Sequence, residues 1–224
     1  MTTLKTLVGV LVLCVFVGLG GSVVRGDLMN LTTVFSGTGP VGNQPWVEIT
    51  FLQQTASSVK VTVDVPAQPV ADPLQSEFLS QVYLNLDPSL NPSLISITQD
   101  SGIAFTSWAV SEDAYKADGD GSYDIDIEYP TANSGRLTTG TSSSFTITYD
   151  SSPLSVSSFD YKSTSGGGAG TCYAAAHVQG IPPGDASGWV GSPSGPSPVP
   201  EPSTFVLLLG GVSLIGFARL RRAI

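Results

Sequence analysis

The chain contains very little cysteine and histidine, which excludes several kinds of chemistry. Among its 224 residues there are two cysteines and one histidine, His177. Cys14 lies in an apolar run near the N-terminus, so Cys172 is the single cysteine in the body of the chain. One cysteine cannot form an intramolecular disulfide, and one cysteine with one histidine cannot build the usual Cys/His zinc cluster. The fold must therefore depend on a hydrophobic core, and we expect Cys172 to be a buried thiol.

Basic residues are nearly missing from the central part of the sequence. All 18 acidic residues lie between Asp27 and Glu201, and the basic residues in that region are Lys60, Lys116, Arg136 and Lys162. A surface this acidic repels the phosphate backbone, which argues against a nucleic acid partner. It is compatible with divalent cations, or with solubility alone.

The N-terminus lacks a hydrophobic run of full membrane-spanning length. Lys5 precedes an apolar run over residues 7–19, which matches the core of a secretory signal and is too short for a comfortable span. We predict a signal helix within residues 1–26, with cleavage before Asp27; cleavage near Gly20 or Ser22 is the alternative. The secretion translocon is then a partner.

Strict alternation of apolar and polar residues dominates the middle of the chain. It is clearest at 47–51, 59–65, 123–129 and 145–149. Such a period predicts antiparallel strands with one buried and one solvated face. Further strands are expected at 78–86, 94–98, 103–110, 158–162 and 172–178. The fold class predicted for residues 27–180 is all-β, an antiparallel β-sandwich of jelly-roll or immunoglobulin-like topology, flanked by the signal helix and a short C-terminal transmembrane helix.

The composition changes after this region. Residues 181–198 are rich in proline, glycine and serine, which predicts a semi-extended linker. Residues 203–218 are apolar or small and would form a helix of about 24 Å, a short membrane span. Arg219, Arg221 and Arg222 follow, and they predict a cytoplasmic C-terminus with the head outside.

Three features in order at the C-terminus resemble a known family. Val199, Pro200, Glu201 and Pro202 precede the apolar run, and the arginine cluster ends it. Over residues 199–224 this closely resembles the PEP-CTERM sorting signal of bacterial exosortase substrates. The resemblance implies that Val199, Pro200, Glu201 and Pro202 are recognised by a membrane-embedded exosortase, which removes the tail and releases the protein or transfers it to the surface. It also implies a bacterium that makes exopolysaccharide. An ordinary single-pass anchor behind a proline-rich stalk is the alternative.

The densest acidic stretch suggests a cation site. Asp118, Asp120, Ser122 and Asp124 fall at positions 1, 3, 5 and 7 of a Ca²⁺ loop template. Two positions depart from that template, because tyrosine stands where it requires a glycine at its sixth position and a glutamate at its twelfth. The competing interpretation is a glycine-rich hairpin turn that leads into a strand with a solvated acidic face.

Other chemistry is weakly supported. Trp189 lies in the glycine-rich segment and is the aromatic residue most expected to be exposed, where it could stack on a sugar. Glu112 with Asp113, or Asp124 with Asp126, could supply the two carboxylates of a glycosidase, but the sequence cannot give their separation. No serine lies in a nucleophile motif. We therefore expect no catalytic residues, and Ca²⁺ is the single cofactor considered.

These observations lead to one functional prediction and two alternatives. The chain is expected to be an exported, non-catalytic protein of the cell surface or extracellular matrix. It would pass through an inner-membrane intermediate with a cytoplasmic C-terminus and be processed by exosortase. The alternatives are a carbohydrate- or Ca²⁺-binding module acting in exopolysaccharide, and a secreted hydrolase.

Overall fold

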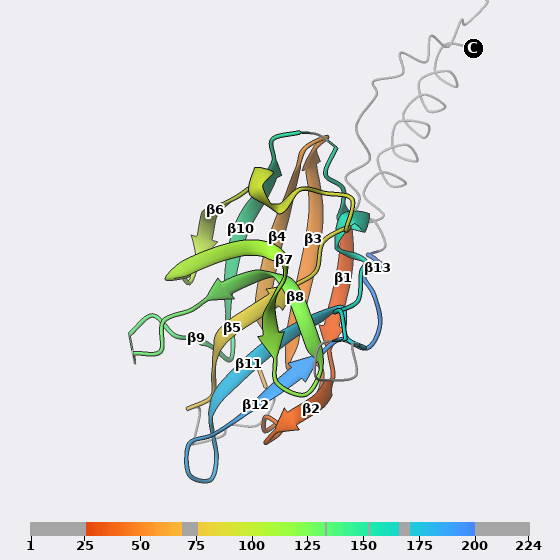
Figure 1. Ribbon diagram of the computed structural model, residues 1–224. Coiled ribbons are helices and arrows are strands. Elements are labelled where there is room, and N and C mark those ends of the chain that lie inside the picture. Colours follow the sequence, from red (N-terminus) through yellow and green to blue (C-terminus); the bar gives the residue numbers. More distant parts are fainter. Residues whose placement is uncertain (1–25, 69–75, 133, 152, 166–170, 200–224) are drawn as a thin grey trace, which may run out of the picture.

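The alternating stretches form two antiparallel sheets in the computed structural model (Figure 1). The structure describes residues 26–68, 76–132, 134–151, 153–165 and 171–199. The first sheet contains, in spatial order, β13 (Ser197–Pro198), β1 (Gly26–Leu31), β3 (Val47–Thr55), β4 (Ser58–Val65), β10 (Thr141–Tyr149) and β6 (Ile95–Gly102). The second contains β2 (Thr33–Gly37), β12 (Ala186–Gly191), β11 (Ala174–Ile181), β5 (Phe78–Leu84), β8 (Gly121–Glu128) and β7 (Ser107–Ala117), with β9 (Leu137–Thr138) also paired to β5.

The core lies between the two sheets and follows from the period of two. From the first sheet, Phe51 in β3, Val61 in β4 and Phe145 in β10 are fully buried. From the second, Val82 in β5 and Ile127 in β8 pack against them in the same cluster. Alternate residues on each strand point away from this core, as one-sided burial requires. The prediction of an all-β fold with two antiparallel sheets is confirmed.

The residues expected to form a linker are instead part of both sheets. Within 181–198, β12 pairs with β11 and β2, and β13 pairs with β1. The glycines serve close packing: a Cβ at Gly191 would come within 2.6 Å of the Cys172 sulfur and 2.9 Å of the Phe35 ring. Pro198 lies in an outermost strand, where a missing N–H is tolerated. The prolines and glycines here allow close packing at the edges of the sheets. The sandwich therefore continues past residue 180, where the sequence placed its boundary with the linker.

A short 3₁₀ helix replaces one of the expected strands. The strand predicted at 158–162 is wrong, because η2 (Val156–Phe159) is a 3₁₀ helix whose first turn is held by a capping box between Ser155 and Ser158. The other helical turn, η1 (Pro92–Leu94), is also 3₁₀. Within the described ranges, no helix is long and apolar enough to cross a membrane. The predicted signal helix and the apolar run at 203–218 lie outside those ranges, apart from Gly26.

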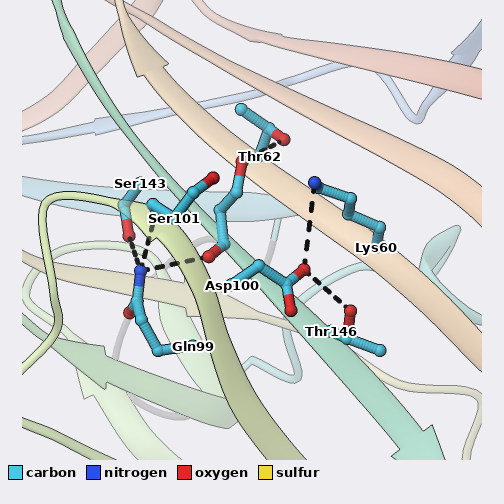
Figure 2. A network of polar contacts seen from close by, with 8 residues as sticks. Lys60, Thr62, Gln99, Asp100, Ser101, Ser143 and Thr146 are labelled. Carbon is cyan, nitrogen blue, oxygen red and sulfur yellow. Dashed lines mark hydrogen bonds and ion pairs between the residues drawn. The ribbon is translucent and has the colours of Figure 1, made fainter.

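The outer face of the first sheet is polar and is satisfied by its own neighbours (Figure 2). Asp100 accepts a 2.8 Å hydrogen bond from Thr146 Oγ1 and lies 3.9 Å from Lys60 Nζ. On the opposite, core-facing side of the same sheet, Gln99 lies across from Phe145, and its amide donates to the carbonyl oxygens of Ser101 (2.9 Å) and Ser144 (3.0 Å) beside a register shift in β10. The charged and hydroxyl side chains of Asp100, Lys60 and Thr146 are thus paired with one another on the outer face, and the Gln99 amide is satisfied by backbone carbonyl groups.

Candidate functional site

The ends of β7 and β8 fold over the outer face of the second sheet. Pairing between β5 and β8 stops at Leu84 and Ile125, whereas β7 and β8 remain paired to Ala117 and Gly121. This hairpin end, residues 111–123, reaches β2, where Ser36 Oγ donates a 2.9 Å hydrogen bond to Asp118 Oδ2. In Figure 1 the green hairpin runs in front of β11 and β12.

A second, smaller hydrophobic cluster lies beneath the hairpin end. Tyr83 contributes a ring whose centroid is 5.7 Å from that of Tyr123 and 5.0 Å from that of Trp189. Phe35 and Tyr115 pack at its margins. Trp189 is only 8% exposed. The exposed sugar platform expected at Trp189 is therefore wrong, because a hairpin from distant sequence covers that ring.

The acidic stretch fixes the hairpin end to the rest of the fold. Asp120 is 1% exposed and accepts hydrogen bonds from Tyr123 Oη (2.8 Å), Thr171 N (2.9 Å) and Ser163 Oγ. Burial alone would raise the pKa of Asp120, but these hydrogen bonds together outweigh it and lower the pKa below its ordinary value. Asp120 thus joins the hairpin end to Ser163 and Thr171.

The four residues of the Ca²⁺ template do not share one site. Asp118 is exposed and bonds Ser36, while Asp120 bonds Ser163 and Thr171. Asp124 uses both carboxylate oxygens, accepting 2.8 Å bonds from Leu86 N and Asp113 N. Ser122 is a buried strand residue bridged to Thr164. In the part of the chain that the structure describes, no three His, Cys, Asp or Glu side chains are grouped to hold a metal ion.

Asp126 is a buried acid on the same outer face. It is 9% exposed and lies opposite Tyr83 and Ala109 in the register. Its Oδ1 is buried and has no hydrogen-bond partner among the residues that the structure describes. Burial, with a smaller contribution from the negative charge of Glu128, raises the pKa of Asp126 to about 6. Asp126 and Glu128 together also contribute to the raised pKa of Tyr83, about 12, although burial of its ring is the main cause.

The carboxylates considered for hydrolysis occupy different surroundings. Glu112, Asp113 and Asp124 line one pocket together with Tyr161 and Lys162. Asp126 does not line that pocket. Because both oxygens of Asp124 already accept backbone N–H groups, it is poorly placed to exchange a proton with a substrate.

The single histidine has a structural environment. His177 Nδ1 lies 3.0 Å from Ser80 Oγ, and its ring stacks on Trp189 with centroids 4.7 Å apart. Burial lowers the pKa of His177. The neutral ring is therefore favoured, and it forms part of the wall beside the aromatic cluster.

Sequence reasoning did not select Arg136, which lies at a hollow of about 500 Å³. The hollow is lined by Ser76, Phe78, Arg136, Gln179, Gly180, Asp185 and Ser187. A signal was present, because Arg136 is the one arginine between Asp27 and Glu201 in a strongly acidic stretch.

Both ends of the sandwich meet at one edge. Asp27 pairs with Pro198 and Leu28 with Ser197, and Val199 N donates a 2.8 Å hydrogen bond to Gly26 O. Val199 is 41% exposed. Of the predicted sorting residues, Pro200, Glu201 and Pro202 lie outside the described residues, as do Arg219, Arg221 and Arg222.

A family model described as the PEP-CTERM protein-sorting motif matches residues 198–222. The match confirms the sorting signal predicted at residues 199–224, and it supports a surface protein targeted to exosortase. No curated protein and no solved structure matches the chain.

Proposed function

We propose that the chain is an exported, non-catalytic protein of the cell surface or extracellular matrix whose β-sandwich is delivered by exosortase processing. The observation that carries this proposal is the sorting motif at 198–222, which begins where the folded head ends. The motif implies exosortase as the processing partner, and it makes Val199 to Pro202 a substrate site.

The position of the two chain ends supports this route. Removal of a signal before Asp27 would take one residue, Gly26, from β1 and leave the other residues of that strand in place. Residues 199–202 can span at most about 14 Å between β13 and the apolar run. The intermediate would thus hold its folded head close to the membrane, with Arg219, Arg221 and Arg222 on the cytoplasmic side.

The side-chain environments support a non-catalytic role. Asp120 and Asp124 are occupied as hydrogen-bond acceptors within the fold. His177 is packed against Trp189. Those contacts explain the acidic stretch through stability, and they make the Ca²⁺ module and the hydrolase weaker alternatives.

The proposal is tested in the producing cell by replacing Pro200, Glu201 and Pro202 with alanine. The variant should remain full-length in the membrane fraction, whereas the native chain should reach the surface without its arginine cluster. Ser194→Ala, before the matched region, is the control and should be processed normally. Normal processing of the triple variant would contradict recognition of the motif.

A further inference from the structure

We propose that the hollow at Arg136 binds a glycan that carries a carboxylate, such as a chain containing uronic acid. The proposal adds a ligand to the proposed surface role. It does not depend on the cleavage step, so either idea can fail alone.

The guanidinium is fixed by the fold and lacks an ionic partner. Arg136 Nε donates a 2.8 Å hydrogen bond to Thr131 O, and its carbon lies 3.9 Å from the centroid of the Phe78 ring. The structure records no salt bridge from Arg136 to another of the described residues, in a domain with a large excess of acids. A half-buried guanidinium held in this way can present its remaining N–H groups to a planar carboxylate.

The wall of the hollow suits hydroxyl groups. Gln179 contributes an amide, Ser187 a hydroxyl and Asp185 a carboxylate that can accept from a sugar hydroxyl. At the rim, Gly180, at φ +70°, lies so close to the backbone of Ser76 that a Cβ at Gly180 would collide with the Ser76 carbonyl oxygen. Ser76 Oγ also donates a 2.6 Å hydrogen bond to Gly180 O.

Two other ligand classes fit less well. A neutral sugar usually stacks on an exposed aromatic face, but Phe78 is 6% exposed and is covered by Arg136. A densely charged phosphate polymer would be repelled by the acidic domain, with Asp185 in the same hollow. A glycan with one carboxylate and many hydroxyl groups matches a hollow in which one arginine is surrounded by neutral and acidic side chains.

Binding is measured on the full chain in detergent, by titration with a short oligosaccharide that contains a single uronic acid residue (the acidic oligomer) and with the same oligosaccharide after reduction of its carboxyl group (the reduced oligomer). We expect weak binding of the acidic oligomer, with Kd of about 1 mM, and at least about tenfold weaker binding of the reduced form. Arg136→Gln should abolish the difference, and Arg136→Lys should keep only part of it because the fork geometry is lost. Lys116→Gln removes an exposed positive charge and is the matched control.

Thermal melting of each variant shows whether the fold survives. If Arg136→Gln fails to fold, Gln179→Ala becomes the test, since it removes one wall donor and should weaken the acidic oligomer by about threefold to tenfold. Equal binding of the acidic and reduced oligomers, an effect of Lys116→Gln as large as that of Arg136→Gln, or binding of an acidic peptide in place of the glycan would overturn the proposal. Absence of binding at 10 mM, about ten times the expected Kd, would also overturn it. None of these results would alter the processing of the C-terminus.

Discussion

Asp120 should contribute more to stability than any other acid of the hairpin end. Replacing it with alanine leaves the hydroxyl groups of Tyr123 and Ser163 buried without their acceptor, and removes the bonds from Thr171. Hydrogen bonds to a charged group contribute about 1.5–3 kcal/mol each. Counting the two buried hydroxyl bonds alone, Asp120→Ala should cost about 3–6 kcal/mol of unfolding free energy.

Urea unfolding monitored by tryptophan fluorescence measures this cost. With an m-value of about 2 kcal/mol/M, the midpoint should fall by about 1.5–3 M. Asp118→Ala is the matched control, because its carboxylate is exposed and has one side-chain bond, to Ser36, so its loss should cost about 0.5–1 kcal/mol. Asp120→Asn keeps the shape without the charge and should fall between the two.

The pH dependence of the same variants has a definite sign. Since the folded pKa of Asp120 is below its unfolded value of about 3.9, its contribution is present above that value and disappears as pH falls through the folded pKa. Equal costs for Asp118→Ala and Asp120→Ala would refute the anchoring role. So would a stabilisation by Ca²⁺ that both variants abolish, since a shared cation site predicts that result.

Three further predictions concern buried side chains near the hairpin end. Asp126 has a folded pKa of about 6 and an unfolded pKa of about 3.9, so the native state binds more protons between those pH values, and stability should fall as pH rises from 4 to 6. Asp126→Asn should therefore raise the unfolding free energy at pH 7 by about 1–2 kcal/mol, and an unchanged or lower melting temperature would contradict this. Trp189→Ala should lower the unfolding free energy measured in urea by about 3 kcal/mol, because a buried ring is removed. Oligosaccharide binding by the folded variant should be unchanged, and loss of binding would show that the ligand contacts Trp189. Burial, together with the charge of Asp120, raises the pKa of Cys172 to about 11, so its thiol should resist alkylation at pH 8 in the exported protein. Asp120→Ala removes the nearby negative charge and should make alkylation faster, and rapid labelling of the native thiol would contradict its burial.

The local sequence was sufficient to predict a strand wherever apolar and polar residues alternate along its whole length. The alternation at 59–65 and 145–149 identified β4 and β10, because each has one face in the core and one in solvent. The sorting signal was equally readable, since its three parts follow one another in the chain.

Features that depend on distant contacts could not be predicted in this way. Trp189 is covered by a hairpin end whose tip carries Asp118, and the sequence around Trp189 does not report that cover. The spacing of Asp118, Asp120, Ser122 and Asp124 fits a Ca²⁺ loop. In the structure two of these residues lie in the turn before β8 and two lie in β8, and their side chains contact separate segments. The segment at 181–198 was misassigned because glycine and proline are equally suited to linkers and to tightly packed sheet edges.

Mass spectrometry of the protein isolated from the cell surface tests the central claim most directly. We expect a mature chain that begins at or near Asp27 and ends after Pro198, with β13 retained and the segment from Arg219 to Ile224 removed. A surface protein that still ends in Ile224 would contradict processing by exosortase.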